Sequence, residues 1–127
     1  MSGIPSGGGT EVLRRGTIQA QNDTATSFKF DGTHPTKGTS TYAVPTHHVI
    51  TMLSISVCCT TAQTDQNFSL WLSSPEVYIL KDVLVVTNQT FVYNEKFVLT
   101  SGDILKFNCE GASDFDVYYS YIDQDFS

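Results

Sequence analysis

Short segments in which apolar and polar residues alternate recur along the chain, and they restrict its fold more than any other feature. Between residues 115 and 121, Phe, Val, Tyr and Tyr occupy every second position. The stretches at 51–59 and 67–73 repeat this alternation. Successive residues of a strand point to opposite faces, so a period of two predicts strands with one buried face. No stretch has the period of an amphipathic helix, and we therefore expect an all-β protein.

The spacing of these strands predicts an antiparallel β-sandwich, jelly-roll-like, of about eight strands. The 127 residues fit one domain with a single hydrophobic core. In the strand at 51–59 we expect every second residue to face that core, namely Leu53, Ile55, Val57 and Cys59. The stretch YNEKFVLTSGDILKF (93–107) predicts a hairpin whose turn is Thr100–Asp103, with Gly102 at a positive φ.

The first residues are rich in Gly, Ser and Pro, which is typical of an arm outside a folded core. We divide the chain into a flexible or extended N-terminal arm at 1–15 and a β-sandwich domain at 16–127. A neighbouring subunit is the expected binding partner of such an arm.

Charge and cysteine usage exclude several classes of partner. The net charge is −6 with only 7 Lys and Arg, so we expect no nucleic-acid binding, which needs basic patches. The sequence contains no long apolar run and its start lacks signal-peptide features, so we expect no membrane partner and folding in a reducing cytoplasm. Three cysteines, two of them adjacent, predict buried thiols rather than a disulfide framework.

Catalytic and metal-binding patterns are not recognisable in the sequence. The adjacent His47 and His48 would point to opposite faces of a strand, which disfavours one shared metal. Nucleophile-elbow, P-loop and dinucleotide motifs are missing. Carboxylates that could form a glycosidase-type pair are Asp82, Glu95, Asp103, Glu110, Asp114 and Asp116. Their spacing singles out no pair, so we predict a non-enzymatic protein without catalytic residues, cofactor or metal; weak cation binding near the C-terminus, by Asp114, Asp116, Asp123 and Asp125, is a less favoured alternative.

Aromatic residues offer three alternatives: core packing, a subunit interface or a glycan-stacking platform. The residues concerned are Tyr42, Trp71, Tyr78, Tyr93, Tyr118, Tyr119 and Tyr121. On a strand, Tyr118 faces away from Tyr119 and Tyr121, so at least one of these three lies off the core.

Several motifs resemble a family of small β-sandwich structural proteins of tailed bacteriophages, including phages of cyanobacteria. The matching stretches follow Pro45 and cover about two thirds of the chain: LSISVCCT (53–60), NFSLWL (67–72), YILKDVLV (78–85), YNEKFVLTSGDILKF (93–107) and FDVYYSYI (115–122). Two positions depart from the family pattern, since Cys59 stands where Asn is frequent and Asp123 stands in place of Glu.

The resemblance implies a virion structural protein assembled in the host bacterial cytoplasm. We expect a multi-copy head decoration or cement protein, with a neck or tail component as the alternative. Its expected partners are the major capsid protein or neck and tail proteins, and further copies of itself in a homo-oligomer. A carbohydrate-binding module for host attachment is the rival from another class. The candidate partner-binding residues are Ile4, Pro5, Val12, Leu13, Arg14, Arg15, Trp71 and Tyr118.

Overall fold

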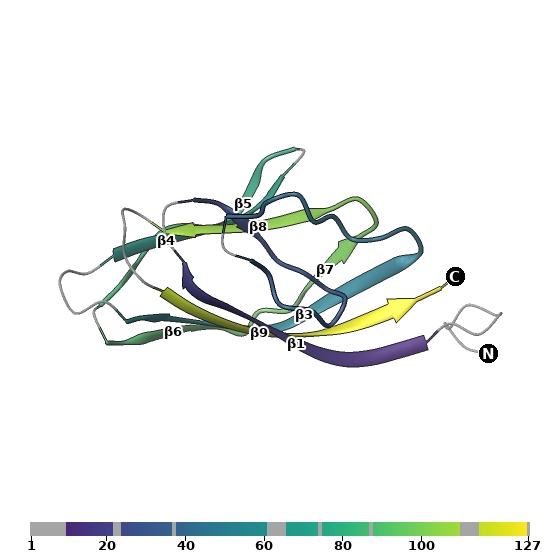
Figure 1. Cartoon of the computed structure of the whole chain (residues 1–127), viewed down its shortest axis with the longest axis horizontal. Coiled ribbons are helices and arrows are strands. Elements are labelled where there is room, and N and C mark those ends of the chain that lie inside the picture. Colours follow the sequence, from purple (N-terminus) through teal and green to yellow (C-terminus); the bar gives the residue numbers. More distant parts are fainter. Residues whose placement is uncertain are drawn as a thin grey trace.

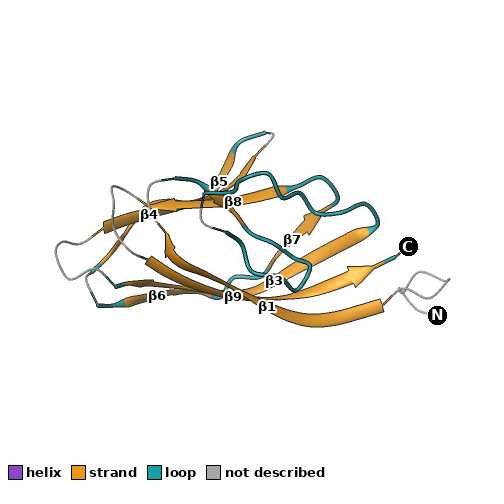
Figure 2. Cartoon of the chain, in the orientation of Figure 1, coloured by secondary structure: helices purple, strands orange, loops and turns teal. Residues whose placement is uncertain are grey.

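The computed structural model describes residues 10–21, 24–36, 38–60, 66–73, 75–86, 88–109 and 115–126. Figure 2 shows strands and loops as the elements of this described part. The strands are β1 (Thr10–Gln21), β2 (Thr26–Ser27), β3 (His48–Cys59), β4 (Gln66–Ser73), β5 (Val77–Val85), β6 (Thr90–Tyr93), β7 (Phe97–Thr100), β8 (Ile104–Cys109) and β9 (Phe115–Asp125).

Two antiparallel sheets face each other across the core (Figure 1). Sheet A has the order β1-β9-β3-β6, with β7 also paired to β3, and sheet B has the order β2-β8-β4-β5. β6 and β7 pair with successive halves of β3, at Ile55–Cys58 and Val49–Met52. When they are counted as one interrupted strand, the two orders become 1-8-3-6 and 2-7-4-5. This order is that of a jelly roll, and it confirms the predicted fold class.

The core is aromatic throughout, but its two ends differ. Toward one end, phenylalanine rings stack on one another, and the ring centroids of Phe68 and Phe107 lie 5.4 Å apart. Toward the other end, Phe28 and Phe30 pack edge-on against Tyr119, at centroid distances of 4.7 and 6.1 Å. Tyr119 and Tyr121 are both fully buried. Of these two aromatic clusters, the one with Tyr119 and Tyr121 therefore places phenolic hydroxyls in the core, and the one with Phe68 and Phe107 does not.

The long connection from β2 to β3 supplies hydrogen-bond partners for these hydroxyls. Tyr119 Oη donates to the Lys29 carbonyl oxygen at 2.7 Å, and Gly32 N donates to Tyr121 Oη at 3.1 Å. Burial raises the pKa of both phenols above its usual value. Buried polar groups are stable only when they are hydrogen-bonded, so the connection and the two tyrosines hold each other in place.

Gly16 in β1 makes room for one of these rings. A Cβ atom at this position would lie 2.2 Å from Tyr119 Cζ. Any larger residue would push β1 away from β9 or expel the ring, because interiors are close-packed. The glycine is therefore required by packing.

In the strand at 51–59, the prediction that Leu53 faces the core is wrong. A β-bulge between Met52 and Ser54 shifts the register of β3 against β9. Met52 consequently enters the core with 1% exposure, and Leu53 turns to the outer side, where it lines a surface hollow. The other predicted core residues, Ile55, Val57 and Cys59, are buried. A bulge adds one residue to a strand, and simple alternation cannot reveal it.

The predicted hairpin at 93–107 is also wrong, although its turn is correct. Asp103 N donates to the Thr100 carbonyl oxygen at 3.0 Å, and Gly102 has a φ of 91°. However, β7 pairs with β3 in sheet A, whereas β8 pairs with β2 and β4 in sheet B. The turn thus crosses from one sheet to the other. The chain leaves sheet A here and does not fold back beside itself.

The predicted arm boundary at residue 15 lies inside a strand. Residues 10–15 form the first half of β1 and pair with β9 from Asp125 to Ser120. Ile4 and Pro5 lie outside the described residues. The division into residues 1–15 and 16–127 stays a prediction.

Candidate interaction surface

The outer side of sheet A carries side chains in straight rows across the strands. The first row consists of Leu13, Ile122, Thr51 and Val98. The second row consists of Thr17, Tyr118, Ser56 and Val92. We call these residues, together with Arg15, Leu53, Cys58 and Asp116 on the same side, the A face.

The A face exposes more apolar surface than a solvent-facing sheet requires. The exposed fractions are 70% for Leu13, 57% for Val98, 49% for Val92 and 45% for Tyr118. An antiparallel sheet that faces water usually carries polar residues at these outward positions. Contiguous exposed apolar side chains on a soluble protein mark interaction sites.

Two hollows lie beside Tyr118 on this face. One, of about 430 Å³, is lined by Ser56, Cys58 and Tyr118 among others. The other, of about 470 Å³, is lined by Leu13, Arg15, Leu53 and Tyr118 among others. The phenol ring therefore projects between two depressions. A relief of this kind suits a protein surface better than a small molecule, because both hollows are open.

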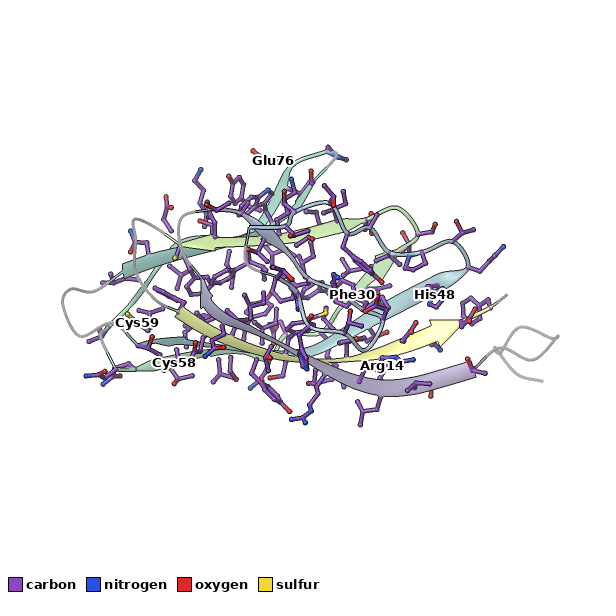
Figure 3. The ribbon with its side chains drawn as sticks, in the orientation of Figure 1. Arg14, Phe30, His48, Cys58, Cys59 and Glu76 are labelled. Atoms are coloured by element: carbon purple, nitrogen blue, oxygen red, sulfur yellow. The ribbon has the colours of Figure 1, made fainter. Side chains whose placement is uncertain are left out.

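Arg14 lies on the opposite side of β1 from Leu13 and Arg15. Its Nε lies 3.5 Å from Asp123 Oδ2, and His48 Nδ1 lies 2.7 Å from Asp123 Oδ1. The Asp123 side chain is only 6% exposed. Figure 3 shows Arg14 and His48 toward one end of the sandwich, and Cys58 and Cys59 toward the other. Arg14 thus neutralises a buried carboxylate, and of the two predicted arginines only Arg15 lies on the A face.

Trp71 lies on the outer side of sheet B, and its own sheet covers it. It is only 8% exposed, and its ring centroid is 5.6 Å from that of Tyr78 on β5. Lys81 Nζ lies 4.5 Å from the Tyr78 ring centroid. The two aromatic rings are therefore contacted from within the chain. Tyr118 is separated from them on the other sheet, so the candidate aromatics form no shared stacking platform.

The candidate carboxylates are dispersed. Asp82 accepts a hydrogen bond from Ser69 Oγ at 3.5 Å, Asp103 accepts one from Thr100 N at 2.8 Å in the turn, and Glu95 is exposed between β6 and β7. Asp116 belongs to the A face, and Glu110 and Asp114 lie outside the described residues. Nothing in this placement brings two of the described carboxylates into a common cleft.

The described part of the chain has neither a metal-binding cluster nor a membrane-spanning helix. Within the described ranges, no group of three His, Cys, Asp or Glu side chains is placed to hold a metal ion. The described elements include no helix that is long and apolar enough to cross a bilayer. All three cysteines are present as thiols, and Cys59 and Cys109 are buried.

Comparison with known proteins identifies the fold but no family. No family model matches the chain, and no curated protein sequence matches it. A subunit of the disulfide-linked pili that form Bacillus endospore appendages is similar, with a TM-score of 0.54, 14% identity, and coverage of 100% of this chain and 98% of that one. A chain from the acid-stable capsid of a Helicobacter pylori bacteriophage gives a TM-score of 0.51, 10% identity and 94% coverage of both chains. The globular domain of zebrafish complement 1qA gives 0.45, with 17% identity and coverage of 88% and 94%. At these identities the likeness shows the jelly-roll fold.

Several residues of the A face were not among the candidates from sequence. Val92 and Val98 are exposed on β6 and β7, and Leu53 is turned outward by the bulge. The sequence does contain a sign that Val98 is exposed. Phe97, Val98 and Leu99 are successive apolar residues of β7, so one of them must point away from the core. A strand without polar positions has both faces apolar, and one of them must be covered by something else.

Proposed function

We propose that this chain is a non-enzymatic structural protein of a tailed bacteriophage virion, present in many copies as a decoration or cement protein of the head. The apolar and weakly charged A face, with Leu13, Val98 and Tyr118 exposed, is the observation that carries the proposal. Enzymes need convergent polar groups in a cleft, whereas assembly proteins need broad complementary surfaces.

The sequence motifs and the fold both support this proposal. The stretches at 53–60, 67–72, 78–85, 93–107 and 115–122 resemble structural proteins of tailed phages. The two similar solved chains with TM-scores above 0.5 are described as parts of a pilus and of a phage capsid. In both of these assemblies a jelly-roll subunit is repeated many times.

Attachment in this proposal uses the N-terminal residues and the edge of sheet A. β1 is an edge strand, which can accept an added strand from a neighbouring protein. At Thr17 this edge is already covered, because Thr17 N donates to His34 Nδ1 at 3.1 Å. An added strand would therefore join β1 nearer Thr10. Weak contacts of this kind become strong when many copies bind together.

Cryo-electron microscopy of intact particles, purified from cells in which this chain is expressed with its phage, tests the proposal. We expect density for a jelly roll on the outside of the head. Density at the neck or tail would replace the head position by the alternative. Particles that contain no such density, with the chain missing from their purified protein content, would overturn the proposal.

Deletion of residues 1–9 tests the mode of attachment. We expect the shortened protein to fold, because the deletion ends before the first paired residue, Thr10. It should no longer bind particles that lack their own copy of the protein. A deletion that continued through residue 12 would remove three residues paired with β9, so residue 9 is the appropriate limit. Undiminished binding of the shortened protein would exclude an attaching arm.

A further inference from the structure

We infer that the A face binds the A face of a second copy of this chain, with Tyr118 of each copy seated in the hollow between Leu13 and Leu53 of the other. This inference deepens the proposed function by naming one neighbour of each copy, and it rests on that function for its setting in the particle. It goes beyond the proposed function because it names the residues that make the contact, and the contact can be measured with purified protein alone.

The relief of the A face is self-complementary. Tyr118 projects with 45% of its surface exposed, and it borders the hollow of about 470 Å³ that Leu13 and Leu53 also line. A projection next to a depression on one surface fits a second, rotated copy of that surface. Such an isologous contact closes after two subunits and uses each feature twice. Arg15 lines the same hollow and would meet the face of the incoming ring as a cation–π partner.

The area of the face is sufficient for a stable contact. The face is four strands wide and follows β9 over nine residues from Asp116 to Gln124. With strands about 4.8 Å apart and a rise of about 3.3 Å per residue, each copy contributes roughly 570 Å² before side-chain relief is counted. Two such faces that overlap completely bury roughly 1,140 Å², slightly above the ~1,000 Å² that separates specific interfaces from incidental contacts.

The A face carries few charges, which allows a second copy of the same chain to approach it. The chain carries a net charge of −6, so two copies repel each other wherever acidic residues meet. The A face carries one positive charge at Arg15 and one negative charge at Asp116, and Glu11 lies on the same side of β1, where Gln124 Nε2 donates to its carboxylate at 2.9 Å. A strongly basic or acidic partner would find little to bind there. We therefore expect added salt to strengthen self-association, since it screens the repulsion between the remaining surfaces.

Cys58 provides a built-in reporter for the contact. It is half-buried on the A face, where it lines the hollow of about 430 Å³ beside Tyr118, whereas Cys59 and Cys109 are buried. The experiment measures the rate of maleimide labelling of native protein over a concentration series, with light scattering on the same samples. We expect the labelling rate of Cys58 to fall at least tenfold as the mass doubles. Association without protection of Cys58, or a monomer at every concentration up to about millimolar, would overturn the inference.

Matched substitutions identify the surface. Leu13→Asp and Tyr118→Ser should each weaken self-association at least tenfold without lowering the melting temperature of the monomer appreciably. Leu84→Asp on sheet B is the control, because Leu84 is 58% exposed and should tolerate the charge without effect on association. If Leu84→Asp dissociates the dimer while Leu13→Asp does not, the contact lies on the other sheet and the inference is wrong.

The outcome is separable from that of the proposed function. A monomeric purified protein that still decorates particles contradicts the A-face contact alone. A dimer with protected Cys58 that is missing from every particle contradicts the virion role alone.

Discussion

Trp71 and Tyr118 are outward-pointing aromatic residues on a central strand of each sheet, but Trp71 is covered and Tyr118 is exposed. Trp71 on β4 is 8% exposed, because Tyr78 packs beside it and Lys81 lies over Tyr78. Tyr118 on β9 is 45% exposed between two hollows. Sheet B covers its aromatic residue with side chains of the same sheet, whereas sheet A leaves its own exposed.

The difference shows why an outward-pointing side chain is not by itself a binding residue. Both residues were candidates for partner binding in the sequence, and both face outward by alternation. Only the neighbouring strand decides which of them is available. For Trp71 this strand is β5, where Tyr78 is its direct partner in the register. Tyr118 has Thr17 and Ser56 as its cross-strand partners, and these are too small to cover a phenol ring.

Substitution of the two aromatics gives the largest effect. Trp71→Ala should lower the free energy of unfolding by about 3 kcal/mol, because it empties a nearly buried site. Tyr118→Ala should cost less than about 1 kcal/mol in the monomer, because the ring already contacts water. Urea unfolding at a concentration that keeps both variants monomeric measures the contrast. Equal losses for the two variants would show that Tyr118 is covered within its own chain.

Gly16→Ala disturbs the packing on the core side of sheet A. The added Cβ would lie 2.2 Å from Tyr119 Cζ, so we expect a loss of about 2 kcal/mol in thermal or urea unfolding. The double variant with Tyr119→Leu should recover part of the loss of Gly16→Ala relative to Tyr119→Leu alone, because the clash partner is gone. Additive losses would mean that the two residues do not compete for space. Sheet B should be unaffected, and Trp71 fluorescence of the folded variants reports on it.

The stability of the protein at alkaline pH tests whether the phenols of Tyr42, Tyr119 and Tyr121 are buried. Burial raises the pKa of Tyr42 to about 12 from an ordinary value of 10, and burial raises the pKa of Tyr119 and Tyr121 as well. Below pH 10 these phenols are neutral in the folded and the unfolded chain. Above it the unfolded chain loses its phenolic protons first, so stability falls as the pH rises from 10 toward 12. Urea unfolding at several pH values measures the fall, and Tyr42→Phe should reduce it. A stability that stays constant to pH 12 would contradict this burial.

Lys81→Ala gives the smallest expected effect. Its ammonium lies 4.5 Å from the Tyr78 ring centroid, and an exposed cation–π contact contributes about 0.5 kcal/mol. We expect a loss of that size in urea unfolding, and a more accessible Tyr78. Lys96→Ala is a suitable control, because Lys96 is exposed between β6 and β7. A loss similar to that of Trp71→Ala would mean that Lys81 itself covers the sheet.

Local pattern was sufficient for the clearly alternating strands and for single turns, although not for the first half of β1, which the sequence assigned to the arm. The alternation in β9 correctly separates the inward Tyr119 and Tyr121 from the outward Tyr118. The Ser-Gly-Asp sequence correctly predicts a turn with a positive φ at Gly102. These features depend on neighbouring residues only, and they are therefore visible in a short stretch of sequence.

Features that depend on distant residues were not predictable. Whether the turn at Thr100–Asp103 stays in one sheet or crosses to the other is decided by β3 and β4, which precede it in the chain. The bulge at Leu53 is defined against β9, more than sixty residues later. The A face likewise collects residues from β1, β3, β6, β7 and β9. Leu13, Arg15 and Tyr118 of this surface are predicted from the sequence, and the strand register identifies the others.

The position of β9 has a consequence for how the protein is made. β9 is the last of the described strands, yet it lies between β1 and β3 and pairs with both over most of its length. Sheet A therefore cannot close until β9, residues 115–125, has left the ribosome. Until then β1 has no neighbour to pair with, and its apolar residues are open to other nascent chains. We expect the release of β9 from the ribosome, rather than the formation of any earlier strand, to set when sheet A closes and is protected from aggregation.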